Sequence, residues 1–372
     1  MRVGEVEQEE FKVEIPFDYN LGIIVLKVNI SGEEYDFILD TGAANVISED
    51  LAKKLDSHIY FEEEVRDVHR RSSNLGFTKI EKLSIGDIDF LNTGAAIADL
   101  KSSEGFGSLI KVDGIIGSNL MRKAIWKIDY QNQIITITNS TKSLNIPDST
   151  FKIPFSTTLV GQPIIDMRLN DITAKEIIVD TGSNGDFSLS KKTFDALVKN
   201  NPSIPQTSSF GVGSVGLYGI GKADSTHFIK VPSISFGEVS LENIIVSFYN
   251  FKNSIGNGFF KNYNLIINWF TKEITLVKIK DYNNSTLSGF GFSSAIQDNR
   301  LTVVSIFENI ENLKLGDQIL KIDEIRYDKL LPEQRDEIIK NGICLCSKKE
   351  ISMVILRDDK ELKYTLKRVT HL

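Results

Sequence analysis

The sequence predicts a mainly β protein made of two similar halves and a smaller C-terminal α+β module. Three observations predict this class. The triplet Asp-Thr-Gly occurs twice, at residues 40–42 and 180–182, each time after an apolar run rich in β-branched residues. Similar landmarks surround both triplets in the same order. The pattern then changes after a polar linker, so we expect two lobes at 13–140 and 150–280 and a module at 287–370.

Each triplet is preceded by a predicted β-hairpin. Ile-Pro-Phe stands at 15–17 and again at 153–155, upstream of the hairpins. Two strand-like runs then flank a short turn in each half. These runs are GIIVLKVNI and YDFILDTG in the first half, and PIIDMRLN and KEIIVDTG in the second. Runs of this kind around turn residues are typical of hairpins.

The segments that follow the triplets also match. A short helical pattern comes first, at 48–55 and 190–200, with Ser48 and Ser190 as expected N-caps. Further matches are LSIGDIDF with ISFGEVSL, then Ile-Ile-Gly at 115–117 with Ser-Ile-Gly at 254–256, and finally residues 126–138 with 265–277 without gaps. One Asp-Thr-Gly is weak evidence, but two with matched flanks predict an internal repeat.

An internal repeat can bring Asp40 and Asp180 together across an approximate twofold axis. Two carboxylates about 3 Å apart cannot both ionise, so they share a proton, and such a pair can activate water and protonate a carbonyl. Gly42 and Gly182 suit the close backbone approach that this requires. A single triplet is also typical of an Asx turn at a strand end. The matched pair favours the catalytic interpretation.

At these residues the chain resembles the retropepsin-like aspartic peptidases, the bacterial relatives of the retroviral and pepsin-type enzymes. Asp-Thr-Gly-Ala at 40–43 is similar to the retroviral form, and Asp-Thr-Gly-Ser at 180–183 to the pepsin form. Ile-Ile-Gly at 115–117 resembles the segment that supports this loop in the family. Ser-Ile-Gly at 254–256 is a poorer match, because its first residue is polar. The resemblance covers roughly 13–280.

The resemblance implies the two-lobed pepsin/retropepsin fold and an aspartic endopeptidase acting on a peptide or protein, with no cofactor and no metal. It implies that Asp40 and Asp180 are the catalytic pair, and that a β-hairpin flap closes over the substrate. The residues expected to support the pair, including two threonines that hydrogen-bond across it, are Thr41, Gly42, Thr181, Gly182, Ser183, Ile116, Gly117, Ile255 and Gly256.

The flap candidates lie between the helical pattern and the matched segments LSIGDIDF and ISFGEVSL. Residues 210–228 are rich in glycine, and Gly216, Tyr218 and Gly219 are the expected flap residues. An ordinary β-hairpin with glycine bulges is the alternative, and a phosphate-binding loop is disfavoured because no Gly-Lys-Ser/Thr follows. The first half offers 65–80, which is polar and basic and lacks the aromatic residue that pepsin-type flaps carry at their tip, so a solvated hairpin tip is the favoured interpretation there.

The C-terminal module resembles a PDZ domain. Gly289-Phe290-Gly291-Phe292 is similar to the carboxylate-binding loop of that family, and Leu-Gly-Asp-Gln-Ile-Leu-Lys-Ile at 315–322 to its Leu-x-x-Gly-Asp-x-Ile-Leu-x-Ile core. The resemblance implies that a peptide adds as a strand while loop amides hold its terminal carboxylate. The first motif alone is also typical of a strand with a bulge, and such a groove can be filled from within the same chain.

Composition excludes several classes of partner. The net charge is −7 and the sequence pI about 5.4, which argues against nucleic acid and anionic membranes. No apolar run reaches membrane-spanning length. Cys344 and Cys346 are the only cysteines, and we expect no disulfide. The charged N-terminus has no signal-peptide core, but chains with this architecture commonly look exported, so we expect an exported protein, with the cytoplasm as the alternative.

Two other function classes stay open. A double lobe that holds peptides without cutting them is the main alternative, and the polar Ser254 favours it slightly, whereas the two intact triplets argue against it. A glycosidase would also use two carboxylates, but at about 5–9.5 Å separation. Nothing in the sequence suggests a sugar-binding surface.

Overall fold

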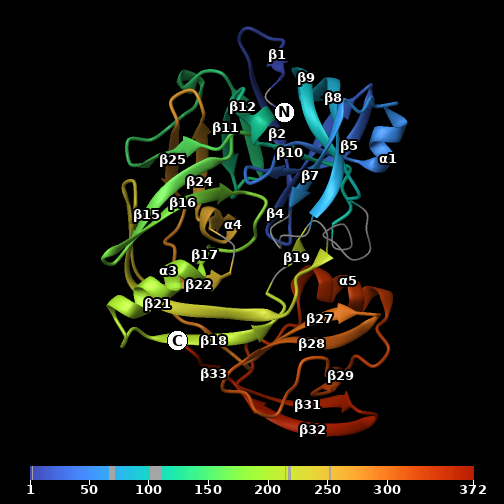
Figure 1. Cartoon of the computed structure of the whole chain (residues 1–372), viewed down its shortest axis with the longest axis vertical. Helices are drawn as coiled ribbons and strands as arrows, with labels where there is room; N and C mark the ends of the chain where they lie inside the picture. Colours follow the sequence, from blue (N-terminus) through green and yellow to red (C-terminus); the bar gives the residue numbers. More distant parts are fainter. Residues whose placement is uncertain (2, 67–71, 101–109, 214, 217–218, 251–252) are drawn as a thin grey trace.

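The computed structural model describes residues 1, 3–66, 72–100, 110–213, 215–216, 219–250 and 253–372. Strands hold 53% of the chain and helices 10%, so the predicted mainly β class is confirmed. Within these ranges, no helix is long and apolar enough to cross a membrane. Figure 1 shows the two halves in the upper part of the view and the C-terminal segment below them.

The first half forms a closed barrel. Its strands pair in the order β4 (Ile23–Ile30), β5 (Glu33–Asp40), β10 (Gly114–Gly117), β6 (Val46–Ser48), β9 (Ile88–Ala98) and β8 (Ser72–Ile85), and β8 returns to β4. Three more strands extend it: β1 (Glu5–Val6), β3 (Asp18–Asn20) and β7 (Phe61–Arg66). The hairpin expected before the first triplet is β4–β5, and β8–β9 form a further hairpin after it.

The second half forms a barrel with the same strand order. The strands are β15 (Pro163–Leu169), β16 (Ile172–Asp180), β23 (Ser254–Gly256), β17 (Phe187–Ser190), β22 (Val239–Tyr249) and β21 (Asp224–Phe236), and β21 returns to β15. Shorter strands accompany them: β14 (Ser156–Thr157), β18 (Gln206–Gly211), β19 (Val215–Gly216) and β20 (Gly219–Ile220). In both barrels, the strand that ends at the Asp-Thr-Gly aspartate pairs in parallel with the short strand that ends in Ile-Gly.

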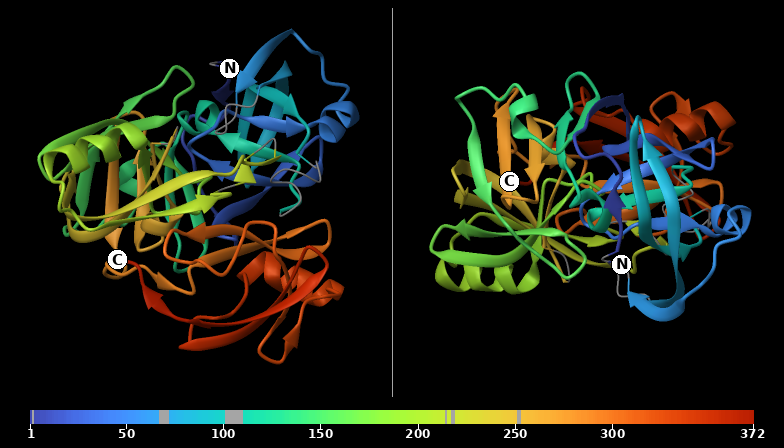
Figure 2. Two further views of the ribbon diagram at one scale, coloured as in Figure 1. Left: turned by 60° about the horizontal axis from the view of Figure 1, so that its bottom comes forward. Right: turned by 90° about the horizontal axis from the view of Figure 1, so that it is seen from above.

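A sheet shared by both halves joins the barrels. Its order is β2 (Lys12–Pro16), β12 (Ile134–Thr138), β11 (Ile125–Asp129), β24 (Tyr263–Asn268), β25 (Glu273–Lys278) and β13 (Phe151–Pro154). The order is symmetric about the β11–β24 pair, where Trp126 lies opposite Ile267. The two outer strands, β2 and β13, therefore each end at the Ile-Pro of an Ile-Pro-Phe landmark. Figure 2 shows the two halves side by side.

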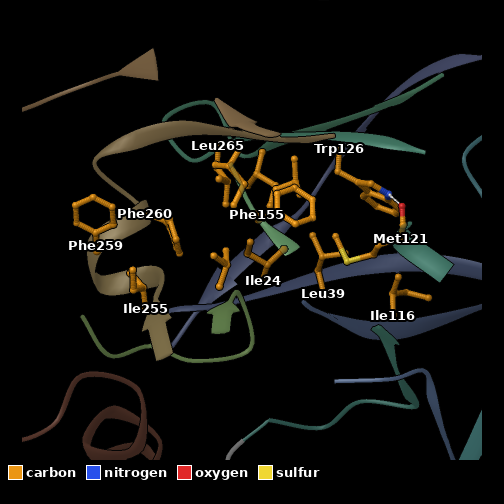
Figure 3. Close-up of a cluster of buried hydrophobic side chains, with 14 of the residues drawn as sticks. Ile24, Leu39, Ile116, Met121, Trp126, Phe155, Ile255, Phe259, Phe260 and Leu265 are labelled. Carbon is orange, nitrogen blue, oxygen red and sulfur yellow. Dashed lines mark hydrogen bonds between the residues drawn. The ribbon is translucent and has the colours of Figure 1, made fainter. Parts of the chain in front are cut away.

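One hydrophobic core continues through both barrels and the shared sheet. Figure 3 shows Ile116 and Leu39 near Trp126, and Ile255 near Phe259, all within this core. Trp126 donates from Nε1 to the Met121 carbonyl at 2.8 Å, which satisfies its buried N–H. Continuity of the core matters because it holds the two barrels, and hence the two aspartate loops, in one arrangement.

Short helices follow the matched strands. They are α1 (Glu49–Lys54), α2 (Ser118–Met121), α3 (Lys191–Asn200) and α4 (Asn257–Phe260), with a 3-10 turn, η2 (Thr141–Ser143). Ser48 caps α1 as predicted, accepting from the Leu51 amide at 3.1 Å. Ser190 occupies the N-cap position of α3, but its side chain makes no capping bond; its hydroxyl lies 3.1 Å from that of Thr193 instead.

The C-terminal segment is a small α+β unit with its own hydrophobic cluster. Its elements are β26 (Ser288–Gly289), β27 (Phe292–Gln297), β28 (Arg300–Phe307), β29 (Gln318–Ile322), β30 (Ile325–Arg326), α5 (Pro332–Asn341), β31 (Glu350–Arg357), β32 (Lys360–Lys367) and β33 (Val369–Thr370). The predicted turn precedes β29: Gly316 has φ +88°. The buried Asp317 accepts two hydrogen bonds from the Arg357 guanidinium, at 2.7 and 2.6 Å.

Strand β18 of the second half pairs with β28 of the C-terminal segment. Ser209, Phe210 and Gly211 lie opposite Phe307, Ile306 and Ser305 in an antiparallel register. This pairing makes one continuous sheet from the second barrel and the C-terminal segment. The sequence repeat does not predict it, because β7, the equivalent strand of the first half, pairs only with β8 among the described residues.

Candidate active site

The two aspartates occupy equivalent positions at strand ends. Asp40 ends β5 and Asp180 ends β16, and each side chain is half-buried. Oδ1 of Asp40 accepts the Gly42 amide at 2.7 Å, and Oδ1 of Asp180 accepts the Gly182 amide at 3.1 Å. Each triplet is therefore an Asx turn that aims its carboxylate back over its own loop.

The two loops are locked together by their threonines. The Thr41 amide donates to Oγ1 of Thr181 and the Thr181 amide to Oγ1 of Thr41, both at 3.0 Å. In turn, the Thr41 hydroxyl donates to the Val179 carbonyl at 2.5 Å and the Thr181 hydroxyl to the Leu39 carbonyl at 2.9 Å. Both threonines are fully buried. This reciprocal pattern joins the strands that carry the aspartates, in the cross-pair contact expected from the sequence.

The carboxylates converge between the two glycines. A Cβ added at Gly42 would lie 2.7 Å from Oδ1 of Asp180 and 3.2 Å from Oδ1 of Asp40. Because both oxygens border one point, their separation cannot exceed the sum of these distances. That sum lies within the roughly 6 Å that two carboxylates can bridge through one water. A side chain at Gly182 would likewise overlap the carboxylate of Asp40, so a side chain at either place would displace one of the two carboxylates.

The supporting segments lie beside the loops. Gly117 pairs with Asp40 along the β10–β5 ladder, and Gly256 pairs with Asp180 along β23–β16. Ile116 and Ile255 are fully buried, opposite Leu39 and Val179 respectively. A side chain at Gly117 would strike the backbone of residues 44–45, and one at Gly256 the backbone of residues 183–185.

The polar Ser254 does not disturb this support. It is buried, its backbone pairs with Ile178 on one side and Ser188 on the other, and its hydroxyl has no hydrogen-bond partner among the described residues. Ser183 is buried as well, and its carbonyl accepts the Asn257 amide at 2.7 Å. The sheet register, rather than the identity of the first residue, sets the position of this segment.

Several hydrogen bonds to the two Asp-Thr-Gly loops come from residues that the comparison of the two halves of the sequence did not single out. Ser118 Oγ donates to the Thr41 carbonyl and Asn257 Nδ2 to the Thr181 carbonyl, both at 2.6 Å. Gln162 donates to the Gly42 carbonyl across the two halves. Their positions in the sequence could have indicated Ser118 and Asn257, because each directly follows the glycine of a supporting segment.

Burial shifts the pKa values of three side chains: Asp186, Tyr19 and Tyr130. Burial raises the pKa of the Asp186 carboxyl. It also raises the pKa of Tyr19 to about 12, with the nearby Asp186 carboxylate adding to the shift. Burial raises the pKa of the Tyr130 hydroxyl well above its usual range. Both tyrosines therefore stay neutral hydrogen-bond donors around neutral pH.

Only part of the predicted flap falls in the described chain. Strands β18 and β21 form the arms of the second candidate, with Gly211 opposite Asp224, and Gly216 pairs with Gly219 beyond them. Tyr218 lies outside the described residues, as do the tip of the first candidate at 67–71 and residues 101–109. Figure 1 shows β19 between the first half and the C-terminal segment.

The predicted carboxylate loop of the C-terminal segment has a defined conformation. Gly289 pairs with Val369, and Phe290 is buried with the Arg368 guanidinium 5.0 Å from its ring centre. Gly291 has φ +74°, and Phe292 begins β27. In the described part of the chain, β27 pairs only with β28, so its other edge is not part of a ladder. Helix α5 lies against this strand.

Comparison with known proteins agrees with the first half of the site. Residues 26–120 match a family model described as aspartyl protease. The match spans the first Asp-Thr-Gly and its supporting segment, and it ends before the second triplet. No curated protein matches the chain. Among the described residues, no group of His, Cys, Asp and Glu side chains has the arrangement of a metal site.

Proposed function

We propose that this protein is an aspartic endopeptidase whose catalytic pair is Asp40 and Asp180. The observation that carries the proposal is the convergence of the two carboxylates on one point between Gly42 and Gly182. The reciprocal threonine bonds hold that geometry. The family match at 26–120 supports peptide hydrolysis independently of the second half.

The chemistry follows from two carboxyl groups that share a proton. Repulsion between like charges separates their two ionisation steps, so one group is ionised while the other is protonated. The ionised carboxylate removes a proton from water as the water oxygen attacks the scissile carbonyl carbon. The protonated group gives its proton to the carbonyl oxygen. Collapse of the tetrahedral intermediate then breaks the C–N bond: the carboxyl that took the water proton gives it to the departing amine, and the other carboxylate takes a hydroxyl proton from the intermediate, which restores the singly protonated pair.

A peptide-library digest tests this proposal. We expect cleavage with a bell-shaped pH profile that an aspartic-peptidase inhibitor abolishes, because activity needs one charged and one neutral carboxyl. Asp40→Asn and Asp180→Asn should each lower kcat by at least about a hundredfold. Asp171→Asn is the matched control, since its exposed carboxylate precedes Asp180 in the same hairpin and bonds only Asn200 in the described structure.

Robust cleavage by either dyad variant would overturn the mechanism. Binding of library peptides without any cleavage by the wild type would instead favour a peptide-binding protein on the same double-barrel scaffold.

We further propose that the C-terminal segment is a PDZ-like module. A peptide would add as a strand along the edge of β27 that does not pair with β28. The positive φ of Gly291, the turn at Gly316 and the position of α5 against β27 support it. In the full chain, amidation of a peptide's C-terminus should weaken binding by about 1.5–3 kcal/mol, the worth of a charge-assisted hydrogen bond. Equal affinity of free and amidated peptides, measured by titration calorimetry, would exclude a terminus-reading groove.

A further inference from the structure

Asn257 forms hydrogen bonds both to the Asp180 loop and to residues of the first half of the chain. It is fully buried at the start of α4. Its amide nitrogen donates to the Thr181 carbonyl at 2.6 Å and to the Gly22 carbonyl at 2.8 Å. Its amide oxygen accepts from the Tyr130 hydroxyl at 2.7 Å. Asn257 thus joins the Asp180 loop to the turn before β4 and to Tyr130, which directly follows β11; both belong to the first half of the chain.

The equivalent position in the first half makes a simpler contact. Ser118 follows Gly117 as Asn257 follows Gly256, and its hydroxyl donates to the Thr41 carbonyl at 2.6 Å. A serine side chain satisfies that one carbonyl and is too short to reach across to the other half. The two aspartate loops are therefore held differently, although their triplets are identical.

The shared sheet explains why the second half needs the longer side chain. In the gap-free match of 126–138 with 265–277, Tyr130 stands where Trp269 does. Trp269 donates directly to the Gly161 carbonyl at 2.8 Å, just before β15. Gly22 lies in the turn directly before β4, and the Tyr130 hydroxyl is linked to its carbonyl through Asn257.

We propose that Asn257 is a positioning residue, held by Tyr130, that fixes the Asp180 loop against the first half of the molecule. Its structural effect stands on these contacts alone, and its effect on turnover rests on the proposed function. The pair is well suited to this task because the Tyr130 hydroxyl donates to the asparagine oxygen, so that each buried polar atom of the asparagine amide has a partner.

Three variants test the proposal: Asn257→Ser, which mimics the first half, Tyr130→Phe, and the double variant. Hydrogen exchange of residues 179–186 should accelerate by about tenfold or more in Asn257→Ser, because the Thr181 carbonyl and the Gly22 carbonyl lose their shared donor. Tyr130→Phe changes the buried volume least and should give a smaller increase in the same segment. The double variant should show less than the sum of both effects, since the two residues act through one hydrogen bond.

Turnover supplies the second measurement. If the protein cleaves peptides, kcat should fall by about tenfold to a hundredfold in Asn257→Ser while KM changes little, because the reacting groups are misplaced rather than the substrate pocket. Asn262→Ser is the matched control: this buried asparagine also donates to backbone carbonyls, those of Gly258 and Phe259, but does not touch the loop. It should leave both kcat and the exchange of 179–186 near wild type.

The two failures are distinguishable. An inactive wild type refutes the proposed function and leaves the exchange measurement valid. Unchanged exchange in both single variants, or equal acceleration in Asn262→Ser, would overturn the positioning role even in an active enzyme.

Discussion

At the scale of single residues, the site depends on hydrogen bonds whose donors and acceptors are buried. Thr41 illustrates this, because its hydroxyl both donates to the Val179 carbonyl and accepts the Thr181 amide. Thr41→Val keeps the shape but leaves both groups unpaired, so we expect it to lower the free energy of unfolding by about 2–5 kcal/mol. Thr41→Ser keeps the hydroxyl and should cost less than about 1.5 kcal/mol. Urea denaturation measures both, and equal losses would contradict the hydrogen-bond explanation.

Asp186 gives a pH-dependent prediction at the same scale. Burial raises its pKa in the folded state. The folded protein therefore holds this proton more tightly than the unfolded chain does, and the stabilisation is lost as pH rises through the raised pKa. Asp186→Asn should remove that loss, so its stability relative to wild type should increase as the pH rises above the ordinary range of an aspartate, about 4. The exposed Asp171→Asn serves as control, and a parallel pH dependence of wild type and Asp186→Asn would contradict the assignment.

At the scale of elements, the short strands β10 and β23 hold the aspartate loops by close backbone contact. A side chain at Gly256 would meet the Ser183 carbonyl oxygen at 2.6 Å. Gly256→Ala should therefore lower the free energy of unfolding by about 1–3 kcal/mol or more, since backbone must move to admit the methyl group. Gly185 lies in the loop that a side chain at Gly256 would disturb. A Cβ added at Gly185 would have the Ser188 hydroxyl as its nearest neighbour, at 3.4 Å, so Gly185→Ala should change the free energy of unfolding by no more than about 0.5 kcal/mol. Similar thermal unfolding of the two variants would argue against this packing constraint.

At the scale of the whole molecule, the C-terminal segment completes the sheet of the second half. The Val212 amide donates to the Val304 carbonyl at 2.8 Å, Ser208 donates to Glu308 at 2.6 Å, and Phe228 stacks on Phe307 at 5.5 Å. Since β18 is also one arm of the candidate flap, the segment holds the base of that flap. A chain of residues 1–284 would expose the β18 edge, and unpaired edges exchange fast and promote association.

We therefore expect the 1–284 chain to lose exchange protection at residues 206–211 and to self-associate in sedimentation measurements. Protection of the shared sheet, such as residues 125–129, should be retained and serves as the internal reference. Unchanged protection at 206–211 would show that β18 does not depend on the C-terminal segment.

The sequence by itself determined the repeat and the places of Asp40 and Asp180. Local patterns suffice for this, because hairpins, turn glycines and the Asx turns of the triplets form from neighbouring residues. The place of Gly117 and Gly256 beside the loops was an expectation from the family resemblance. Only the tertiary structure decided how the halves are joined: the partners of Asn257, the symmetric shared sheet and the β18–β28 pairing. These features depend on contacts between residues far apart in the chain. Asn257, for example, forms hydrogen bonds with Gly22 and Tyr130. No local pattern marks such a buried asparagine, since its role depends on which carbonyls the folded backbone leaves without a donor.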